Sequence, residues 1–322
     1  MTWNALKERF KPGVRRRTGP FVLPAVALEI EPDFVAGARL NATARQVERV
    51  AVRELETRAL QPLPNRSNFS EEAGLRQAIR SVTDAIGNGT GYVGLLVPDG
   101  TARVGILSFE TLPDYHAEAE ALVRWRMKEV LPYPAEEARL SCQILRNEPG
   151  NIEMLAVAAR GSVISEYELA LEHLNGGPAL ILPATMALLP LLPDRDEAGQ
   201  LLIHVCSGWV TTVVVVGNSV RLWRNRDLGR MELPELAGDV AREAARVLAS
   251  SRDHLKVEIE RVRLCARPPA TAELGAELAR VLAHPVEPLA PRSELAAALP
   301  GTERLLFERF GATFAGLVSN PS

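Results

Sequence analysis

The sequence predicts an α/β protein built from two lobes and a smaller inserted subdomain. The chain has 322 residues, which is long for one compact core and fits two lobes of ordinary domain size. In the first hundred residues, apolar runs occur in the order strand, strand, strand, helix, strand. A second group of buried strands begins at Gln200, and a separate strand-and-helix block lies between the two groups. These observations predict the two lobes and the insert.

The bulk composition is that of an ordinary soluble globular protein, with 47% hydrophobic and 24% charged residues. The formal net charge of -3 gives no global reason to expect nucleic acid as a partner. No window reaches about 18 uninterrupted apolar residues, so no membrane-spanning helix is expected. The N-terminus also lacks the apolar core and cleavage site of a secretory signal, and we expect a cytoplasmic protein. Three cysteines without CxxC spacing, Cys142, Cys206 and Cys265, are expected to be buried, reduced thiols.

Residues 1–20 form a basic N-terminal tail. Its basic residues are Lys7, Arg9, Lys11, Arg15, Arg16 and Arg17, against the single acid Glu8. Trp3, Leu6 and Phe10 have helical spacing, so a short helix here would have an aromatic face and a basic face. Two interpretations stay open: a frayed, solvated tail, or a peripheral contact with anionic lipid or with a partner.

We assign residues 21–100 and 177–198 to the first lobe. The stretch Ala25 to Leu40 has the pattern of two short strands joined by a tight acidic turn. Residues 47–55 have the pattern of a weaker third strand, with a helix as the alternative. Ser70 is expected to cap the helix that follows. The core stripe of that helix is Leu75, Ile79, Val82 and Ile86.

We assign residues 101–176 to the inserted subdomain. Its most informative stretch contains an amphipathic helix over residues 116–131, a Leu-Pro-Tyr-Pro corner and an alternating strand. The preceding TARVGILSF has the composition of a strand. A strand over 152–159 and a helix from about Ser165 complete the order β-α-β-β-α. The helical stripe is Ala119, Val123, Met127 and Val130.

Residues 199–322 form the second lobe in this interpretation. Two buried strands meet at a Gly217-Asn218 turn, and a third strand follows. A long helix comes next, then a short strand over 262–265 and a helix that Thr271 can cap. A last helix is expected from the apolar stripe Leu306, Phe310, Phe314 and Leu317.

The Pro132-Tyr133-Pro134 corner and the elements around it resemble PilM, the actin-like cytoplasmic protein of type IV pilus assembly. Members of that family read roughly EQYIPFPLEEV where this chain reads EVLPYPAEE from Glu129 to Glu137. The order of the insert also resembles that of the cell-division protein FtsA. The resemblance covers nearly the whole chain and implies an α/β, actin-like (ribonuclease H-like) two-lobed fold with an FtsA/PilM-type inserted subdomain. The cytoplasmic part of the type II secretion protein L is a close rival, but that family continues into a membrane span.

The resemblance locates the first of the three turns with which actin-like proteins hold ATP, and this turn is altered. Glu29 stands at the family's Asp, Glu31 at a Gly, and Pro32 and Asp33 at Ser positions. Proline removes a backbone donor. The two acids place negative charge where phosphate would lie, and like charges ~4 Å apart repel by about 1 kcal/mol in water and about 4 kcal/mol at an effective dielectric near 20.

The other two turns are altered as well. In the second, His204 replaces an Asp, Cys206 replaces a Gly, and Trp209 puts bulk where phosphate would pass. In the third, Arg267 lies in a stretch that has no glycine. The resemblance therefore implies degenerate nucleotide turns and no bound cofactor.

No other catalytic pattern replaces the nucleotide turns. The five histidines are scattered, without HExxH or Cys/His ligand spacing, and the chain has no GxSxG or P-loop motif. A packed or hydrogen-bonded His204 is favoured over a catalytic base. We predict a protein that is not an enzyme and has no metal site. The alternative is an actin-like ATPase of the same machinery that still binds ATP in the interlobe cleft.

PilM binds an N-terminal cytoplasmic peptide of the membrane protein PilN in a groove between its first lobe and its insert. The resemblance therefore implies a PilN-like partner, with other pilus or secretion platform subunits as further candidates. The implied function is a non-catalytic cytoplasmic scaffold of a type IV pilus or related secretion machine, peripheral to the inner membrane through that partner. Ile106, Phe109 and Trp125 are the expected anchors of the peptide. The alternative is that all three are core residues.

Overall fold

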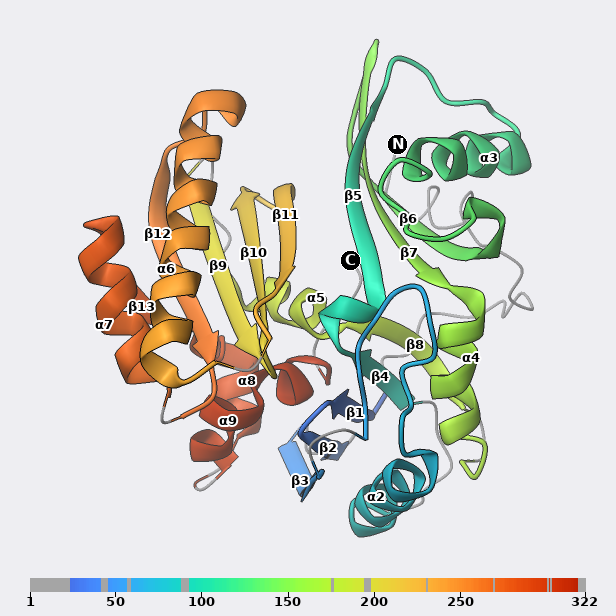
Figure 1. The fold of residues 1–322 in the computed structure, drawn as a ribbon, viewed down its shortest axis with the longest axis vertical. Helices are drawn as coiled ribbons and strands as arrows, with labels where there is room; N and C mark the ends of the chain where they lie inside the picture. Colours follow the sequence, from blue (N-terminus) through green and yellow to red (C-terminus); the bar gives the residue numbers. More distant parts are fainter. Residues whose placement is uncertain are drawn as a thin grey trace.

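The computed structural model describes residues 24–41, 46–56, 59–87, 93–174, 177–193, 198–229, 231–268, 270–299, 301 and 303–317. The basic tail expected over residues 1–20 lies outside the described residues. Within them, the strands form two five-stranded sheets and one three-stranded sheet. Figure 1 shows the second five-stranded sheet beside the three-stranded sheet, with the first five-stranded sheet below them.

The first sheet has the strand order β3-β2-β1-β4-β8. Its strands are β1 (Val26–Glu31), β2 (Phe34–Asn41), β3 (Gln46–Glu54), β4 (Val93–Val97) and β8 (Pro178–Pro183). β1 is antiparallel to β2 and parallel to β4. Every residue of β1 is buried because helices cover both faces of the sheet. One face carries α2 (Glu72–Ala85) and α4 (Gly161–Ala170), and the other carries α5 (Ala184–Leu188), the short helix η3 (Leu189–Leu191) and α9 (Glu303–Ala315).

The second sheet has the order β11-β10-β9-β12-β13. Its strands are β9 (Gly199–Cys206), β10 (Trp209–Val216), β11 (Ser219–Asp227), β12 (Ile259–Ala266) and β13 (Val286–Pro288). One face is covered by α6 (Leu233–Ser250) and α7 (Ala270–Leu282). A π-helical turn, η4 (Ser251–Leu255), continues α6, and α8 (Ser293–Ala298) precedes α9. The predicted turn at Gly217-Asn218 is confirmed, since Val216 pairs with Ser219 across it.

The three-stranded sheet is antiparallel, with the order β5-β7-β6. It consists of β5 (Ala102–Phe109), β6 (Ala138–Glu148) and β7 (Asn151–Arg160), with α3 (His116–Met127) packed on one face. The short helices η1 (Asp99–Thr101) and η2 (Ala135–Glu137) precede β5 and β6. The predicted element order β-α-β-β-α is confirmed.

Two helix boundaries near the insert differ from the prediction. α3 ends at Met127 rather than at residue 131, and Val130 is 49% exposed instead of completing the buried stripe. Pro132 explains the early end, because proline disfavours helical conformation in the residue before it. The helix expected from about Ser165 begins at Gly161, directly after β7, because Val163 is already a core residue.

Two predicted helix caps are wrong, although both helices are present. The residue that precedes α2 is Glu71, and no side chain caps its first turn. Ser70 instead donates its backbone N–H to the carbonyl of Ala59. Thr271 lies inside α7, and its hydroxyl donates to the Ala266 carbonyl at 2.6 Å. The weak third strand is confirmed as β3, and the helical alternative there is wrong.

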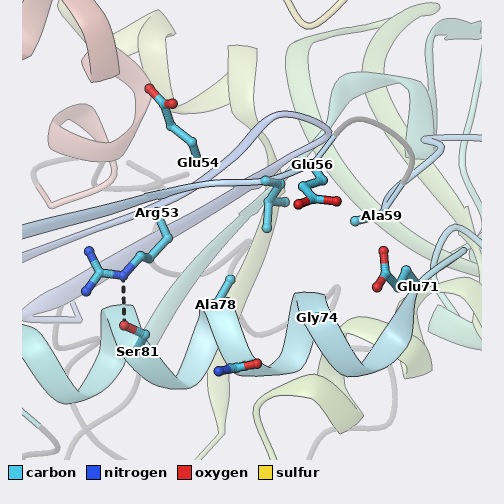
Figure 2. A pocket seen from close by; sticks show the side chains of 10 residues that line it. Arg53, Glu54, Glu56, Ala59, Glu71, Gly74, Ala78 and Ser81 are labelled. Atoms are coloured by element: carbon cyan, nitrogen blue, oxygen red, sulfur yellow. Dashed lines mark hydrogen bonds between the residues drawn. The ribbon is translucent and has the colours of Figure 1, made fainter.

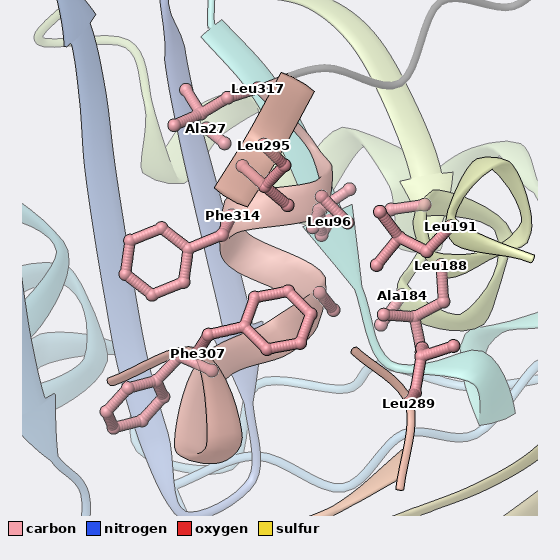
Figure 3. Close-up of a cluster of buried hydrophobic side chains, with 14 of the residues drawn as sticks. Ala27, Leu96, Ala184, Leu188, Leu191, Leu289, Leu295, Phe307, Phe314 and Leu317 are labelled. Atoms are coloured by element: carbon pink, nitrogen blue, oxygen red, sulfur yellow. The ribbon is translucent and has the colours of Figure 1, made fainter. Parts of the chain in front are cut away.

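Two helices pack outside the segment to which the sequence assigned them. α4 lies within the segment assigned to the insert, yet its buried Val163 and Tyr167 belong to the core of the first sheet. α9 follows the second sheet, yet it packs on β1, β2 and α5. Figure 3 shows Phe307 and Phe314 of α9 between the first sheet and the α5 region. The domain boundaries stay a prediction, and packing does not follow them at these two helices.

The described residues include three cysteines, each partly buried and none in a disulfide bond. Burial raises the pKa of Cys142 and of Cys265 to about 12, so both are poor nucleophiles at neutral pH. In the same part of the chain, no helix combines the length and the apolar content needed to cross a bilayer.

We expect Phe314→Ala to lower the free energy of unfolding by about 3–5 kcal/mol, because it empties a fully buried aromatic site shared by α9 and the first sheet. The matched control is Leu305→Ala in the same helix, where a side chain that is 67% exposed should change stability by less than about 0.5 kcal/mol. Urea denaturation measures both. Equal losses in the two variants would contradict the packing described for α9.

Candidate interlobe site

The three turns that the sequence analysis compared with nucleotide-binding turns meet between the two lobes, because each follows the carboxyl end of a central strand. β1 ends at Glu31 and β4 ends at Val97, and these strands are parallel neighbours. β9 ends at Cys206 and β12 at Ala266, and these strands are also parallel neighbours. The carboxyl ends of parallel strands lie at one edge of a sheet, which is where ligands bind in open α/β sheets.

The three turns bind one another directly. The Asp33 carboxylate, in the turn after β1, accepts a hydrogen bond from the Ser207 hydroxyl in the turn after β9. It also forms an ion pair with Arg267, after β12, at 2.6 Å. The Arg267 guanidinium lies 4.5 Å from the ring centroid of Phe34 and 5.5 Å from that of Phe310. The structure thus brings together three residues that lie far apart in the sequence.

The turn that presents Ser207 is a tight two-residue hairpin. Ser207 and Gly208 both have positive φ, at 50° and 83°, as the hairpin turn that matches strand twist requires. A Cβ on Gly208 would lie 2.5 Å from the Gly229 carbonyl oxygen, so this position needs glycine. The turn therefore holds the Ser207 hydroxyl in one place.

Trp209 fills the space next to this turn. A Cβ on Gly100, in η1, would lie 2.7 Å from Cζ2 of Trp209, so the indole is in direct contact with the backbone of η1. Two cavities between the lobes have volumes of about 10 Å³ each; Phe34 and Arg267 border one of them, and Trp209 borders the other. A volume of that size holds about one water molecule, whereas small-molecule sites measure roughly 300–1,000 Å³.

Glu29 and Glu31 are each only 2% exposed beneath the joined turns. Burial raises the pKa of Glu29. A hydrogen bond that Glu29 accepts from Thr313 of α9 and the favourable charge of His204 act in the opposite direction but do not cancel this effect. Burial raises the pKa of Glu31 further above its ordinary value, and the neighbouring Glu29, Asp99 and Asp33 carboxylates add to the effect. Both environments favour the neutral acid.

A second buried network is centred on Asp99. Its carboxylate accepts hydrogen bonds from the Thr185 N–H at 3.0 Å, from the Thr211 hydroxyl at 2.6 Å and from the Thr185 hydroxyl. His204 Nδ1 lies 2.7 Å from the Thr185 hydroxyl oxygen, which accepts because its own proton goes to Asp99. Burial acts to raise the pKa of Asp99, but His204 and the two threonines outweigh it and hold the pKa below its usual range.

Sequence reasoning missed Asp99 and its two threonine partners, Thr185 and Thr211. The available signal was an Asp-Gly pair just beyond the buried run that became β4, at the edge where the carboxyl ends of strands gather. His204 lies in a hydrogen-bonded network, as the favoured interpretation held. In the described part of the chain, no group of three or more His, Cys, Asp or Glu side chains is placed to hold a metal ion.

The three expected peptide anchors do not share one surface. Phe109 is 7% exposed and belongs to the core beneath α3. Ile106 is partly buried and packs against the interlobe core that includes Leu155 and Val220. Trp125 is 63% exposed on α3, with the Arg126 guanidinium 6.0 Å from its ring centroid. Only Trp125 is placed to contact a partner with most of its side chain.

The chain between β3 and α2 makes the contact between the first sheet and the insert. The Asn68 side chain, fully buried, donates to the Thr101 hydroxyl and to the Tyr167 hydroxyl, both at 3.1 Å. The Asn68 N–H donates to the Glu166 carboxylate at 2.8 Å. Phe69 packs edge-on against the Tyr167 ring at 5.0 Å between centroids. These bonds fix the insert relative to the first lobe.

Comparison with known proteins establishes the fold. The chain matches no protein-family model and no curated protein. Among solved structures, it is similar to a chain of the PilM-PilN type IV pilus biogenesis complex, with a TM-score of 0.77 and 16% identity over 91% of this chain and 97% of that one. A Bacteroides thetaiotaomicron protein with an actin-like ATPase fold and unknown function gives a TM-score of 0.56 and 11% identity over 85% and 94% of the two chains. The predicted PilM-like, actin-like two-lobed α/β fold is confirmed.

We expect Glu31→Gln to become progressively more stabilising as the pH rises. The pKa of Glu31 is raised in the folded state, so between its ordinary value of 4.5 and the raised value the folded chain holds a proton that the unfolded chain has lost. Stability of the wild-type protein therefore falls with rising pH across that window, by up to about 1.4 kcal/mol per pH unit, and glutamine removes this loss.

Urea denaturation from pH 5 to pH 8 measures the difference between the variant and the wild-type protein. Glu118→Gln, at an exposed position of α3, serves as the control and should show no such trend. A difference that does not change with pH would show that the folded protein does not hold Glu31 as a neutral acid.

Proposed function

We propose that this chain is a non-catalytic cytoplasmic scaffold of a type IV pilus or related secretion machine. The observation that carries the proposal is the combination of a fold similar to a chain of the PilM-PilN complex with an interlobe site filled by the chain's own side chains. The protein is held at the inner membrane through its partner. That partner is a PilN-like membrane protein, whose N-terminal cytoplasmic peptide the chain binds; other platform subunits are further candidates.

The absence of ATP chemistry is the first part of the proposal, and four features of the interlobe site support it. Pro32 has no N–H to donate to a phosphate. Arg267 and Ser207 are already bonded to Asp33. Trp209 occupies space beside η1, and the two cavities described between the lobes are about 10 Å³ each. A polyphosphate would therefore have to break the contact between the lobes and approach buried acids.

The alternative is an actin-like ATPase that still uses the interlobe cleft. The similarity to a protein with an actin-like ATPase fold supports it at the level of the fold alone. The two functions differ in one measurable property, the affinity for Mg-ATP.

We expect calorimetric titration with Mg-ATP to give no saturable heat at ligand concentrations up to about 1 mM, a range that would reveal any binding stronger than roughly 4 kcal/mol. The reason is the closed cleft and the altered turns. Single-turnover assays with labelled ATP should show no hydrolysis above the rate without protein. A micromolar dissociation constant would favour the ATPase instead.

The peptide groove is the second part of the proposal, and we place it where the first lobe meets the insert. Trp125 is the best-placed anchor, because exposed tryptophans are over-represented among residues that dominate binding energy. Phe109 supports α3 from beneath, and Ile106 supports the contact with the second lobe. These two residues therefore affect the groove indirectly, because they hold the insert in position.

We expect Trp125→Ala to weaken binding of the N-terminal cytoplasmic peptide of a PilN-like protein from the same organism at least tenfold, at an unchanged melting temperature. Phe109→Ala is the matched comparison, and it should lower the free energy of unfolding by about 3 kcal/mol because it leaves a cavity under α3. Fluorescence anisotropy and thermal melts measure the two effects. Full affinity in Trp125→Ala would place the peptide elsewhere on the protein.

A further inference from the structure

A separate pocket lies on the first lobe between the end of β3 and α2. Its volume is about 370 Å³, which is within the range of peptide and small-molecule sites. All of the residues that line it come from positions 53–81, so neither the insert nor the second lobe contributes to it. Figure 2 shows it bounded by α2 on one side and by the end of β3 on the other. It is therefore distinct from the groove proposed above and from the interlobe site.

The strand that borders this pocket has an open edge. β3 is the terminal strand of the first sheet, and no strand of the described residues pairs with its outer side. The Leu55 N–H donates to the Asp33 carbonyl at 2.9 Å, so Leu55 points its backbone groups toward β2. Because successive residues of an extended chain alternate, Val52 and Glu54 direct their N–H and C=O groups toward the open edge. Such an edge is a template for an added strand.

The helical wall of the pocket leaves room for another chain. Gly74, Ala78 and Ser81 of α2 line the pocket with small side chains. A Cβ on Gly74 would have no neighbour closer than 3.5 Å, the Glu71 carboxylate, so the glycine is not required by contacts within the protein. A glycine inside a helix disfavours the helix, and here it widens the space opposite β3.

The charge of the pocket selects the kind of chain that fits. Glu56 and Glu71 lie toward one end of the pocket, near Ala59, and Arg53 lies toward the other (Figure 2). Arg53 donates to the Ser81 hydroxyl at 2.9 Å. Within the described residues, no ion pair involves Glu56 or Glu71, so both carboxylates are placed to accept a cationic side chain.

We propose that this pocket binds an extended basic segment of a partner protein. The segment adds a strand to the open edge of β3, pairs with the backbone of Val52 and Glu54, and places a lysine or arginine between Glu56 and Glu71. Main-chain hydrogen bonds supply affinity that does not depend on sequence. The two carboxylates supply the selection for positive charge.

The test uses the full chain and two labelled heptapeptides, one alternating valine with lysine or arginine and one with glutamate at the basic positions. We expect saturable binding of the basic peptide alone, measured by fluorescence anisotropy, and slower amide exchange at Val52 and Glu54 in the complex. The variant Glu56→Gln/Glu71→Gln should bind at least tenfold more weakly. Glu118→Gln, an exposed charge loss on α3, should bind as the wild-type protein does.

Several outcomes would overturn the proposal. These are no saturable binding of the basic peptide, equal binding of the acidic peptide, an equal loss in Glu118→Gln, or protection at residues away from β3. A peptide of residues 1–20 that protects the same amides more strongly would make the chain's own basic tail the occupant and would also overturn the assignment to a partner. Thermal melts of both variants separate a loss of binding from a loss of folding.

Discussion

The contact of Asp33 with Ser207 and Arg267 determines how the two lobes meet. It joins a turn of the first sheet to two turns of the second, across 174 and 234 residues of chain. An ion pair whose Asp33 side chain is 41% exposed stabilises a fold by only about 0–1 kcal/mol. Its importance is positional, because it closes the edge where the carboxyl ends of β1, β9 and β12 meet. Phe34 and Phe310 lie against the Arg267 guanidinium and fix the contact further.

The buried acids beneath this contact differ in how the protein accommodates each carboxyl group. Asp99 has three donors and a nearby His204, so its charged form is compatible with burial. Glu31 has no comparable set of donors and lies among other carboxylates, which raises its pKa. A buried carboxyl group that stays neutral needs no counter-ion, whereas an entering polyphosphate would add negative charge beside it. Glu31 therefore costs the folded protein stability as the pH rises, while the charged Asp99 would repel an entering polyphosphate.

The sequence predicted the order of elements well because hydrophobic periodicity depends on neighbours in the chain. The strands, the insert and the corner at Pro132 all follow from local patterns. The contacts of Asp33 and Asp99 could not be predicted, since their partners come from distant strands whose register the sequence does not specify. Both predicted caps are wrong because the helix boundaries lie elsewhere: Glu71, not Ser70, precedes α2, and Thr271 lies inside α7.

One error could have been avoided from the sequence. Ile106 and Phe109 are three residues apart on one strand, and side chains alternate with a period of two, so they must face opposite sides of the sheet. The structure places Ile106 toward the second lobe and Phe109 beneath α3, as that alternation requires. A single groove could not have used both. Trp125 differs because it lies on a helix, whose side chains repeat every 3.6 residues. The buried residues of α3 occupy the opposite face, so Trp125 is on the exposed face.

The way in which the lobes are held together bears on the proposed scaffold role. A ligand can shift a conformational equilibrium only by as much as it binds one state better than another. Here the link between the lobes consists of the chain's own side chains and of α9, which packs on the first sheet while following the second in sequence. On the proposed function, the relative position of the lobes needs no nucleotide. Asn68 fixes the insert to the first lobe in the same way, through Thr101, Tyr167 and Glu166. A protein built like this presents its outer surfaces at constant separation. The exposed face of α3 and the open edge of β3 are therefore suited to holding two partner segments at a defined distance, which is what a structural platform requires.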